Sequence, residues 1–205
     1  MRRSSVRQWR WTLPVLAAAV LLAGCQSMSG SVHYPDAVDA CKLPGPNTPA
    51  QLAPGTVEIP AGSIKTADAK VVPTDRSSGD NELTSCKRLF ARDLGGGKPN
   101  LQDYRLVTIA VVRFTGSDDT QAAAKATQLM TEALADHSGV RLATGVGDEA
   151  GFSESWAAVR SGNVVLGMAI ADGGTEAALI PPATLDNVQA MVTDMTGTLR
   201  RDYQG

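Results

Sequence analysis

Residues 104–114 read Tyr-Arg-Leu-Val-Thr-Ile-Ala-Val-Val-Arg-Phe, and this run predicts a β-strand more strongly than any other stretch of the chain. β-Branched residues are frequent in it, and its charged residues stand only toward the two ends. The centre of the run is apolar at both odd and even positions. Because successive side chains of a strand point to opposite faces, this pattern predicts a strand that is covered on both faces.

The sequence on either side of this run predicts more strands. Residues 86–92 predict one, and residues 153–160 and 164–171 predict the two arms of a hairpin that turns at Ser161-Gly162-Asn163. The second arm, Val-Val-Leu-Gly-Met-Ala-Ile-Ala, is again apolar on both faces. Strands that are joined by such short turns must be antiparallel.

Two amphipathic helices complete the predicted fold. Asp118 and Asp119 supply acids for the start of the first helix, which is expected to end near residues 137–139. Thr184 is expected to cap the second helix. Since each helix has one apolar side, the predicted fold class is α+β, a mostly antiparallel sheet with helices on both faces (an αβα sandwich).

The first 25 residues have the features of a targeting segment. Four arginines precede an apolar run over residues 13–23, which as a helix would be roughly 16 Å long, about half the hydrocarbon thickness of a bilayer. The run therefore predicts a signal peptide over residues 1–24 rather than a membrane span. Leu22-Ala23-Gly24-Cys25 resembles the lipobox of bacterial lipoproteins, which implies that Cys25 is lipidated and becomes the new N-terminus. An ordinary secretory cleavage site that precedes Cys25 is the alternative.

Lipidation would place the mature protein on the extracytoplasmic face of the cell membrane. Each buried methylene contributes about 0.8 kcal/mol, so two or more chains such as palmitate form a stable anchor. The leader carries four of the 19 Lys and Arg residues, so its removal leaves 15 basic against 21 acidic residues, and the net charge changes from −2 to about −6. This acidic body argues against a nucleic-acid partner and against a basic patch on anionic lipid.

The mature chain is expected to consist of a flexible tether and one domain. Residues 25–38 are predicted to be the tether, because small polar residues without periodicity dominate there, and residues 39–205 to be a single α+β domain. Cys41 and Cys86 are the thiols that remain once Cys25 is acylated, and in an oxidising exterior they are expected to pair. The bridge closes a loop of about 45 residues, and in the chain-entropy model this cross-link stabilises the folded state by roughly 4 kcal/mol. A structural bridge is favoured, since a redox-active pair is more often a close Cys-x-x-Cys.

The block Gly-Val-Gly-Asp-Glu-Ala-Gly-Phe over residues 145–152 is the most individual part of the sequence. Its glycine spacing is not that of a dinucleotide-binding loop, because a strand rather than a helix follows. Asp148, Glu149 and Trp156 are the candidate ligand-binding residues in and beside it. No catalytic residue, metal site or cofactor is predicted, because the two histidines stand in poor contexts and no free thiol remains.

The order of these features resembles a family of actinobacterial lipoproteins of unknown function. The features are the lipobox, Cys41 near Asp39, a proline-rich interval, Cys86, a long strand, an alanine-rich helix, Val-Gly-Asp-Glu-Ala at 146–150 and Val-Arg-Ser-Gly-Asn-Val-Val at 159–165. That family is similar in turn to the extracytoplasmic sensor domain of certain mycobacterial Ser/Thr kinases. The resemblance covers about 40–200 and implies an αβα sandwich with a disulfide and a cleft for an unidentified ligand.

We therefore expect a non-catalytic, lipid-anchored binding or accessory protein of the sensor-like kind. The membrane is its predicted partner through the anchor, and the ligand in the sheet–helix cleft is a small molecule, an envelope lipid or an envelope protein. One alternative is an extracytoplasmic hydrolase that uses Asp148, Glu149 and Glu154 as acid and base. Another is a structural envelope protein without any ligand.

Overall fold

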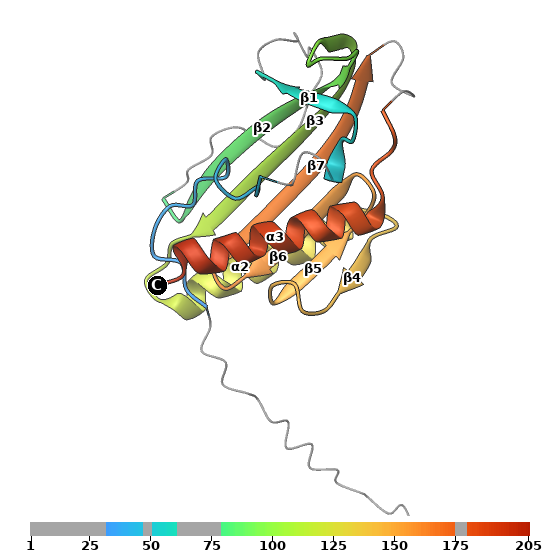
Figure 1. Ribbon diagram of the computed structural model, residues 1–205. Coiled ribbons are helices and arrows are strands. Elements are labelled where there is room, and N and C mark those ends of the chain that lie inside the picture. The colour runs from blue at the N-terminus through green and yellow to red at the C-terminus, as the bar shows by residue number, and fades with distance from the viewer. Residues whose placement is uncertain (1–31, 47–50, 61–78, 175–179) are drawn as a thin grey trace, which may run out of the picture.

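The computed structural model describes residues 32–46, 51–60, 79–174 and 180–205 (Figure 1). The predicted signal peptide and Cys25 lie outside the described residues, as does the first part of the predicted tether. Among the described residues, no helix is long and apolar enough to cross a membrane.

A seven-stranded antiparallel sheet is the main structural unit of the described chain. Its strand order is β1-β2-β3-β7-β6-β5-β4, and every pair of neighbours is antiparallel. In sequence order the strands are β1 (Thr56–Ile59), β2 (Asn81–Asp93), β3 (Pro99–Phe114), β4 (Arg141–Ala143), β5 (Glu149–Phe152), β6 (Trp156–Ser161) and β7 (Val164–Gly174). Figure 1 shows β2, β3 and β7 as long neighbouring strands that run the length of the domain.

Strand β3 lies at the centre of the sheet between β2 and β7. Its residues 105–111 are buried without interruption, which confirms the prediction of a strand covered on both faces. The strand is longer than predicted, because it already begins at Pro99 and pairs there with the end of β2. Arg105 and Arg113, the charges toward the two ends of the predicted run, are buried as well.

The second helix begins after its predicted cap, and the first begins within the polar stretch expected at its start. Helix α2 (Asp119–Ala135) starts after Asp118, whose side chain accepts a hydrogen bond from the backbone N–H of Gln121. Helix α3 (Leu185–Tyr203) starts after Thr184, whose side chain accepts from Asn187 in the same way. Arg200 and Arg201 occupy the last turn of α3, where positive charge favours the helix dipole.

The buried apolar residues form two clusters. The larger contains the buried residues of α3, including Val188 and Met195, together with Ala157 and Val159 of β6. The smaller contains Ala122, Ala126 and Met130 of α2 together with Ala158 of β6. Alternate residues of β6 therefore belong to different clusters.

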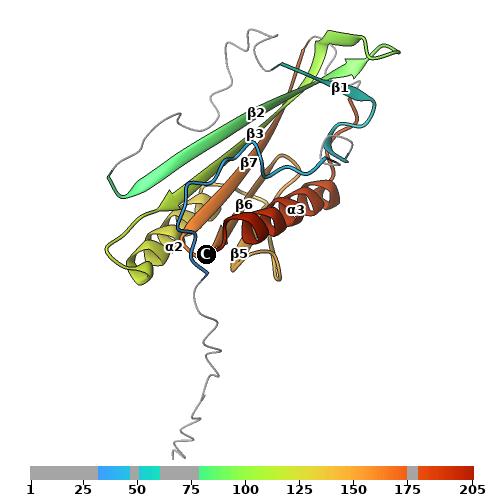
Figure 2. The same cartoon turned by 60° about the vertical axis from the view of Figure 1, so that its left-hand side comes forward.

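The N-terminal described segment packs into the larger cluster with α3. Tyr34, Val38, Ala40 and Leu43 are all buried in it. In Figures 1 and 2 this segment, drawn in blue, begins close to the C-terminus, and the Gly205 N–H donates to the carbonyl oxygen of His33 at 3.4 Å. Residues 32–38, which belong to the predicted tether, thus lie against the sheet.

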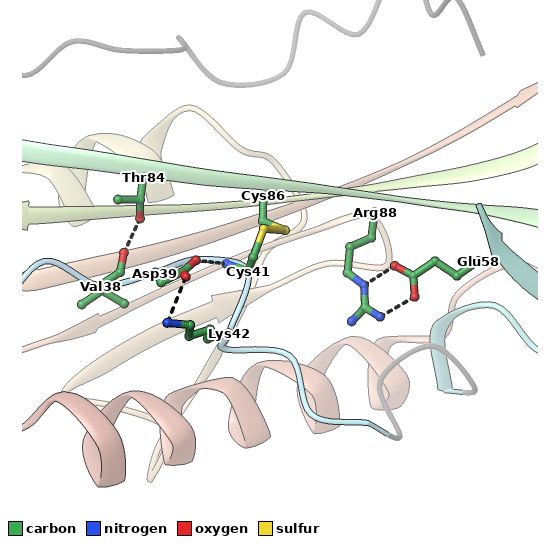
Figure 3. The surroundings of a disulfide bond; sticks show 8 residues. All are labelled: Val38, Asp39, Cys41, Lys42, Glu58, Thr84, Cys86 and Arg88. Carbon is green, nitrogen blue, oxygen red and sulfur yellow. Dashed lines mark hydrogen bonds and ion pairs between the residues drawn. A yellow bond between two sulfur atoms is a disulfide. The ribbon is translucent and has the colours of Figure 1, made fainter. Parts of the chain in front are cut away.

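A disulfide joins this segment to β2. Cys41 and Cys86 are bonded, as predicted, with a sequence separation of 45 residues (Figure 3). Close to it, the Thr84 hydroxyl donates to the carbonyl oxygen of Val38 at 2.5 Å, and Asp39 Oδ1 accepts from the Cys41 N–H at 3.0 Å. The segment is therefore held to the middle of β2 by one covalent bond and one hydrogen bond.

The antiparallel sheet and the disulfide confirm those parts of the predicted fold class. The predicted hairpin at 153–171 is also confirmed as β6 and β7, which turn at Gly162. Strands β1, β4 and β5 were not predicted, and β2 extends beyond the predicted 86–92 at both ends. The chain is mostly sheet with two helices among its described residues, and the sandwich with helices on both faces remains a proposal.

Candidate functional site

Two of the three predicted ligand-binding residues contact one arginine. Asp148 Oδ2 accepts hydrogen bonds from Arg160 Nη1 at 3.0 Å and from the Gly162 N–H at 2.7 Å. Glu149 Oε2 lies 3.7 Å from Arg160 Nε. The carboxylate of Asp148 therefore holds the β6–β7 turn, and both acids have their charge balanced within the protein.

Trp156, the third predicted residue, lies elsewhere. It begins β6, whereas Arg160 stands near the end of the same strand. Its ring stacks on the ring of His137, with the centroids 4.0 Å apart and the planes inclined by 16°. The structure thus brings Asp148 and Glu149 together but does not bring Trp156 to them.

The turn that Asp148 holds is part of a buried polar cluster around Tyr34. The Tyr34 hydroxyl lies 2.8 Å from Ser161 Oγ, and Asn163 Oδ1 accepts from the Tyr34 N–H at 2.9 Å. Asn163 Nδ2 donates to the carbonyl oxygens of Tyr34 and Phe114. Burial raises the pKa of the Tyr34 hydroxyl, while its hydrogen bond to Ser161 and the charge of Arg200 oppose part of that rise.

Arg113 completes this cluster from β3. Its Nη1 donates to the carbonyl oxygens of Pro35, at 2.6 Å, and Tyr34, at 3.3 Å, and its Nη2 lies 2.7 Å from Glu82 Oε2. The guanidinium can therefore be buried, because an acid and two carbonyl oxygens satisfy it. Arg113 and Tyr34 are not among the predicted site residues. The signals they leave in the sequence are a charge at the end of a buried strand and an aromatic residue inside a polar stretch.

A second buried arginine with an acidic partner nearer the surface lies toward the opposite end of β3. Arg105 is fully buried, and its Nε and Nη2 donate to Asp172 Oδ1 at 2.6 Å and Oδ2 at 2.8 Å. Its Nη1 donates to the carbonyl oxygen of Leu52. The pair thus ties β3, β7 and the segment before β1 together, and it serves the packing of this end of the domain.

The histidines and the acids that the sequence suggested for hydrolysis lie in separate places among the described residues. His33 Nδ1 pairs with Asp119 at 3.0 Å, and His137 stacks on Trp156. Glu149 is the first residue of β5, whereas Glu154 lies beyond the last residue of that strand. Glu154 is therefore not beside Asp148 and Glu149. Within the described part of the chain, no group of three or more His, Cys, Asp or Glu side chains could hold a metal ion.

The described surface has several hollows, of which two are the stronger candidate binding sites. The first has a volume of about 620 Å³ and is open and polar. It is lined by Ser138, Gly139, Arg141, Ser153, Glu154, Ser155, Thr184, Leu185 and Asp186. Most of these residues are exposed, so this hollow would leave most of a small ligand in water.

The second hollow, which we call the α2 cleft, lies between α2 and strands β2 and β3. It has a volume of about 350 Å³ and is lined by Asn81, Leu83, Val112, Phe114, Lys125, Gln128, Leu129 and Glu132. Leu83 and Val112 are cross-strand partners, Phe114 is buried, and Val112 and Leu129 pack against the smaller core cluster. The interior of the α2 cleft is therefore more apolar than the first hollow but similarly open to solvent, and its volume is one that small ligands occupy.

Polar contacts flank this interior. Lys125 Nζ lies 2.9 Å from Asp80 Oδ2, which joins α2 to the turn before β2. Gln128 Nε2 donates to Glu132 Oε1 at 2.9 Å along α2. Comparisons of the chain with protein-family models, curated proteins and solved structures gave no match.

Proposed function

We propose that this protein is a lipid-anchored extracytoplasmic binding lipoprotein of the accessory or sensor-like kind. In this proposal Cys25 carries the lipid, the membrane is the partner through that anchor, and the domain lies on the outer face of the cell membrane. The disulfide between Cys41 and Cys86 supports an oxidising location. The protein would act by binding rather than by catalysis.

The observation that carries this proposal is the α2 cleft. The sequence resemblance to the lipoprotein family implies a cleft for a ligand, and a hollow of about 350 Å³ lies between a helix and the sheet. Its apolar lining would gain free energy by losing contact with water when a ligand enters.

We interpret the architecture as the αβα sandwich that the same resemblance implies. Ala157 and Val159 belong to the cluster of α3, while the intervening Ala158 belongs to that of α2. Because neighbouring side chains of a strand point to opposite faces, this alternation supports one helix on each face of the sheet. The α2 cleft would then open on the face that α2 covers.

Thermal unfolding of the full chain, purified from its own membranes, tests the proposed function. An extract of the same cell envelope should raise the melting temperature, because a ligand that binds only the folded state stabilises it. A Leu83→Trp variant, which fills the α2 cleft, should lose this rise. Leu142→Trp is the matched control, since Leu142 lies on edge strand β4 and is 73% exposed.

The outcome is unambiguous when both variants fold. A rise in wild type and in Leu142→Trp, but not in Leu83→Trp, supports binding in the α2 cleft. If no fraction of the envelope changes the melting temperature of the wild type, the binding function is wrong and a purely structural role is favoured.

A further inference from the structure

The interior of the α2 cleft is suited to an aliphatic chain. The residues that the strands contribute are Leu83, Val112 and Phe114, with Asn81 at the start of β2, and α2 contributes Leu129. Both charged residues of the lining make a contact within the protein: Lys125 forms an ion pair with Asp80, and Glu132 accepts a hydrogen bond from Gln128. An aliphatic chain would gain free energy by burial against the apolar residues of this lining, while Lys125, whose partner Asp80 is exposed, stays available to an anionic group.

The α2 cleft also lies at the end of the domain from which the chain runs back toward Cys25. His33 Nδ1 pairs with Oδ1 of Asp119, the first residue of α2, and Leu129 lies about 15 Å further along that helix. Asn81 and Phe114 are paired partners at this same end of the sheet.

Cys25 precedes Val32 by seven residues, which span at most about 25 Å when fully extended. A lipid on Cys25 would therefore keep this end of the domain, and the α2 cleft with it, toward the membrane surface. At that surface the apolar ligand of highest concentration is membrane lipid.

From these observations we propose that the α2 cleft binds one acyl chain of a phospholipid from the membrane that anchors the protein. This inference rests on the proposed function and names the chemical class of its ligand. A volume of about 350 Å³ is at the lower end of the range for small-molecule sites, which fits one chain better than two. Lys125 can exchange its exposed partner Asp80 for the lipid phosphate, because both are anionic oxygen acceptors.

Native mass spectrometry of the full-length lipoprotein, released from its own membranes in a non-ionic detergent, tests this inference. The wild type should carry one additional phospholipid mass. After this lipid is removed, added lysophosphatidylglycerol, which has one acyl chain, should bind, whereas glycerophosphoglycerol, the same head group without a chain, should not. Palmitic acid in a parallel titration separates recognition of the phospholipid from recognition of a free fatty acid.

Two substitutions to glutamine provide the comparison. Leu129→Gln places an amide in the α2 cleft and should reduce the lipid-bound fraction about tenfold. Leu142→Gln makes the same change on exposed edge strand β4 and should leave it unchanged. Circular dichroism melting checks that both variants fold, and Leu83→Gln replaces Leu129→Gln if the latter does not.

The possible results separate the two proposals. Lipid binding that Leu129→Gln weakens and Leu142→Gln preserves supports the acyl-chain site. If wild-type protein binds no lysophospholipid but is still stabilised by an aqueous envelope extract, the acyl-chain inference is wrong and the binding function remains. Equal lipid binding by both variants, or binding of palmitic acid alone, also overturns the phospholipid site.

Discussion

The hydroxyl of Tyr34 and the Oγ of Ser161 lie 2.8 Å apart, although 127 residues separate them in the chain. Both side chains are buried, and the contact joins the N-terminal described segment to the end of β6. Asn163 and Arg113 bind the backbone of the same segment. These residues therefore anchor the start of the described chain to the sheet independently of the disulfide.

Tyr34→Phe should destabilise the folded protein by about 1–3 kcal/mol, because it leaves the buried Ser161 hydroxyl without its partner. Urea denaturation at neutral pH measures this loss. Tyr203→Phe is the matched control, since Tyr203 packs against the same core cluster and its hydroxyl makes no hydrogen bond to any described residue. Equal stability of the two variants would show that the Tyr34 hydrogen bond contributes nothing.

The stability of the wild type should decrease in alkaline solution in a way that depends on Tyr34. Burial raises the pKa of Tyr34 above its ordinary value of 10.0, so the folded state retains the phenolic proton at pH values where the unfolded chain has lost it. This contribution is complete below pH 10.0 and is lost as the pH rises through the folded-state pKa, with a slope of up to about 1.4 kcal/mol per pH unit.

Denaturation curves at a series of pH values from neutral to about 11 test this sign. The wild type should lose stability more steeply than Tyr34→Phe above pH 10.0, so that the difference between them shrinks. A difference that stays constant over this range would contradict the predicted shift.

Replacement by alanine should have opposite effects on stability at Gly162 and at Gly197. Gly162 has a φ of +55°, and a Cβ on it would overlap the backbone carbonyl of Val32, so Gly162→Ala should destabilise the protein by about 1–3 kcal/mol. Gly197 lies within α3, and a Cβ there would meet no atom within 4 Å, so Gly197→Ala should stabilise it by about 0.5–1 kcal/mol. Thermal melts of both variants beside the wild type decide whether the signs are as predicted.

Much of the fold could be predicted from local sequence because the relevant signals are local. The apolar centre of β3, the acids at the start of α2 and the cap Thr184 each have a short-range physical cause, and the pairing of Cys41 with Cys86 follows from the cysteine count. Strand β5 was missed because its four residues include Gly151 and follow several other glycines. Leu134 and Val140 occupy the space that a side chain at position 151 would need, so glycine is required there for a tertiary reason that is not visible in the sequence.

The buried polar cluster was missed for a related reason. Arg113 stands at the end of a strand, where a charge normally faces water, and its burial requires carbonyl oxygens of Tyr34 and Pro35 from 78 or more residues away. The predicted ligand residue Asp148 was noticed for its motif, yet its carboxylate binds Arg160 and the Gly162 N–H. The α2 cleft itself depends on how α2 lies over β2 and β3, which helix periodicity does not specify.

The N-terminal segment has two attachments, the Tyr34 cluster and the disulfide, and their removal should not be additive. Replacing Cys41 and Cys86 by alanine should cost about 2–4 kcal/mol while the segment stays bound through Tyr34. Tyr34→Ala should also leave the segment in place, because the disulfide keeps it near the sheet at a high effective concentration.

With both attachments removed, the segment can leave the sheet and expose Val38 and Leu43, which are buried in the folded protein. The combined variant should therefore lose more stability than the two separate losses together, by at least about 0.5 kcal/mol, as expected for groups that act on the same segment. Urea denaturation of the four proteins closes this double-mutant cycle. Strict additivity would mean that each attachment stabilises a separate part of the domain.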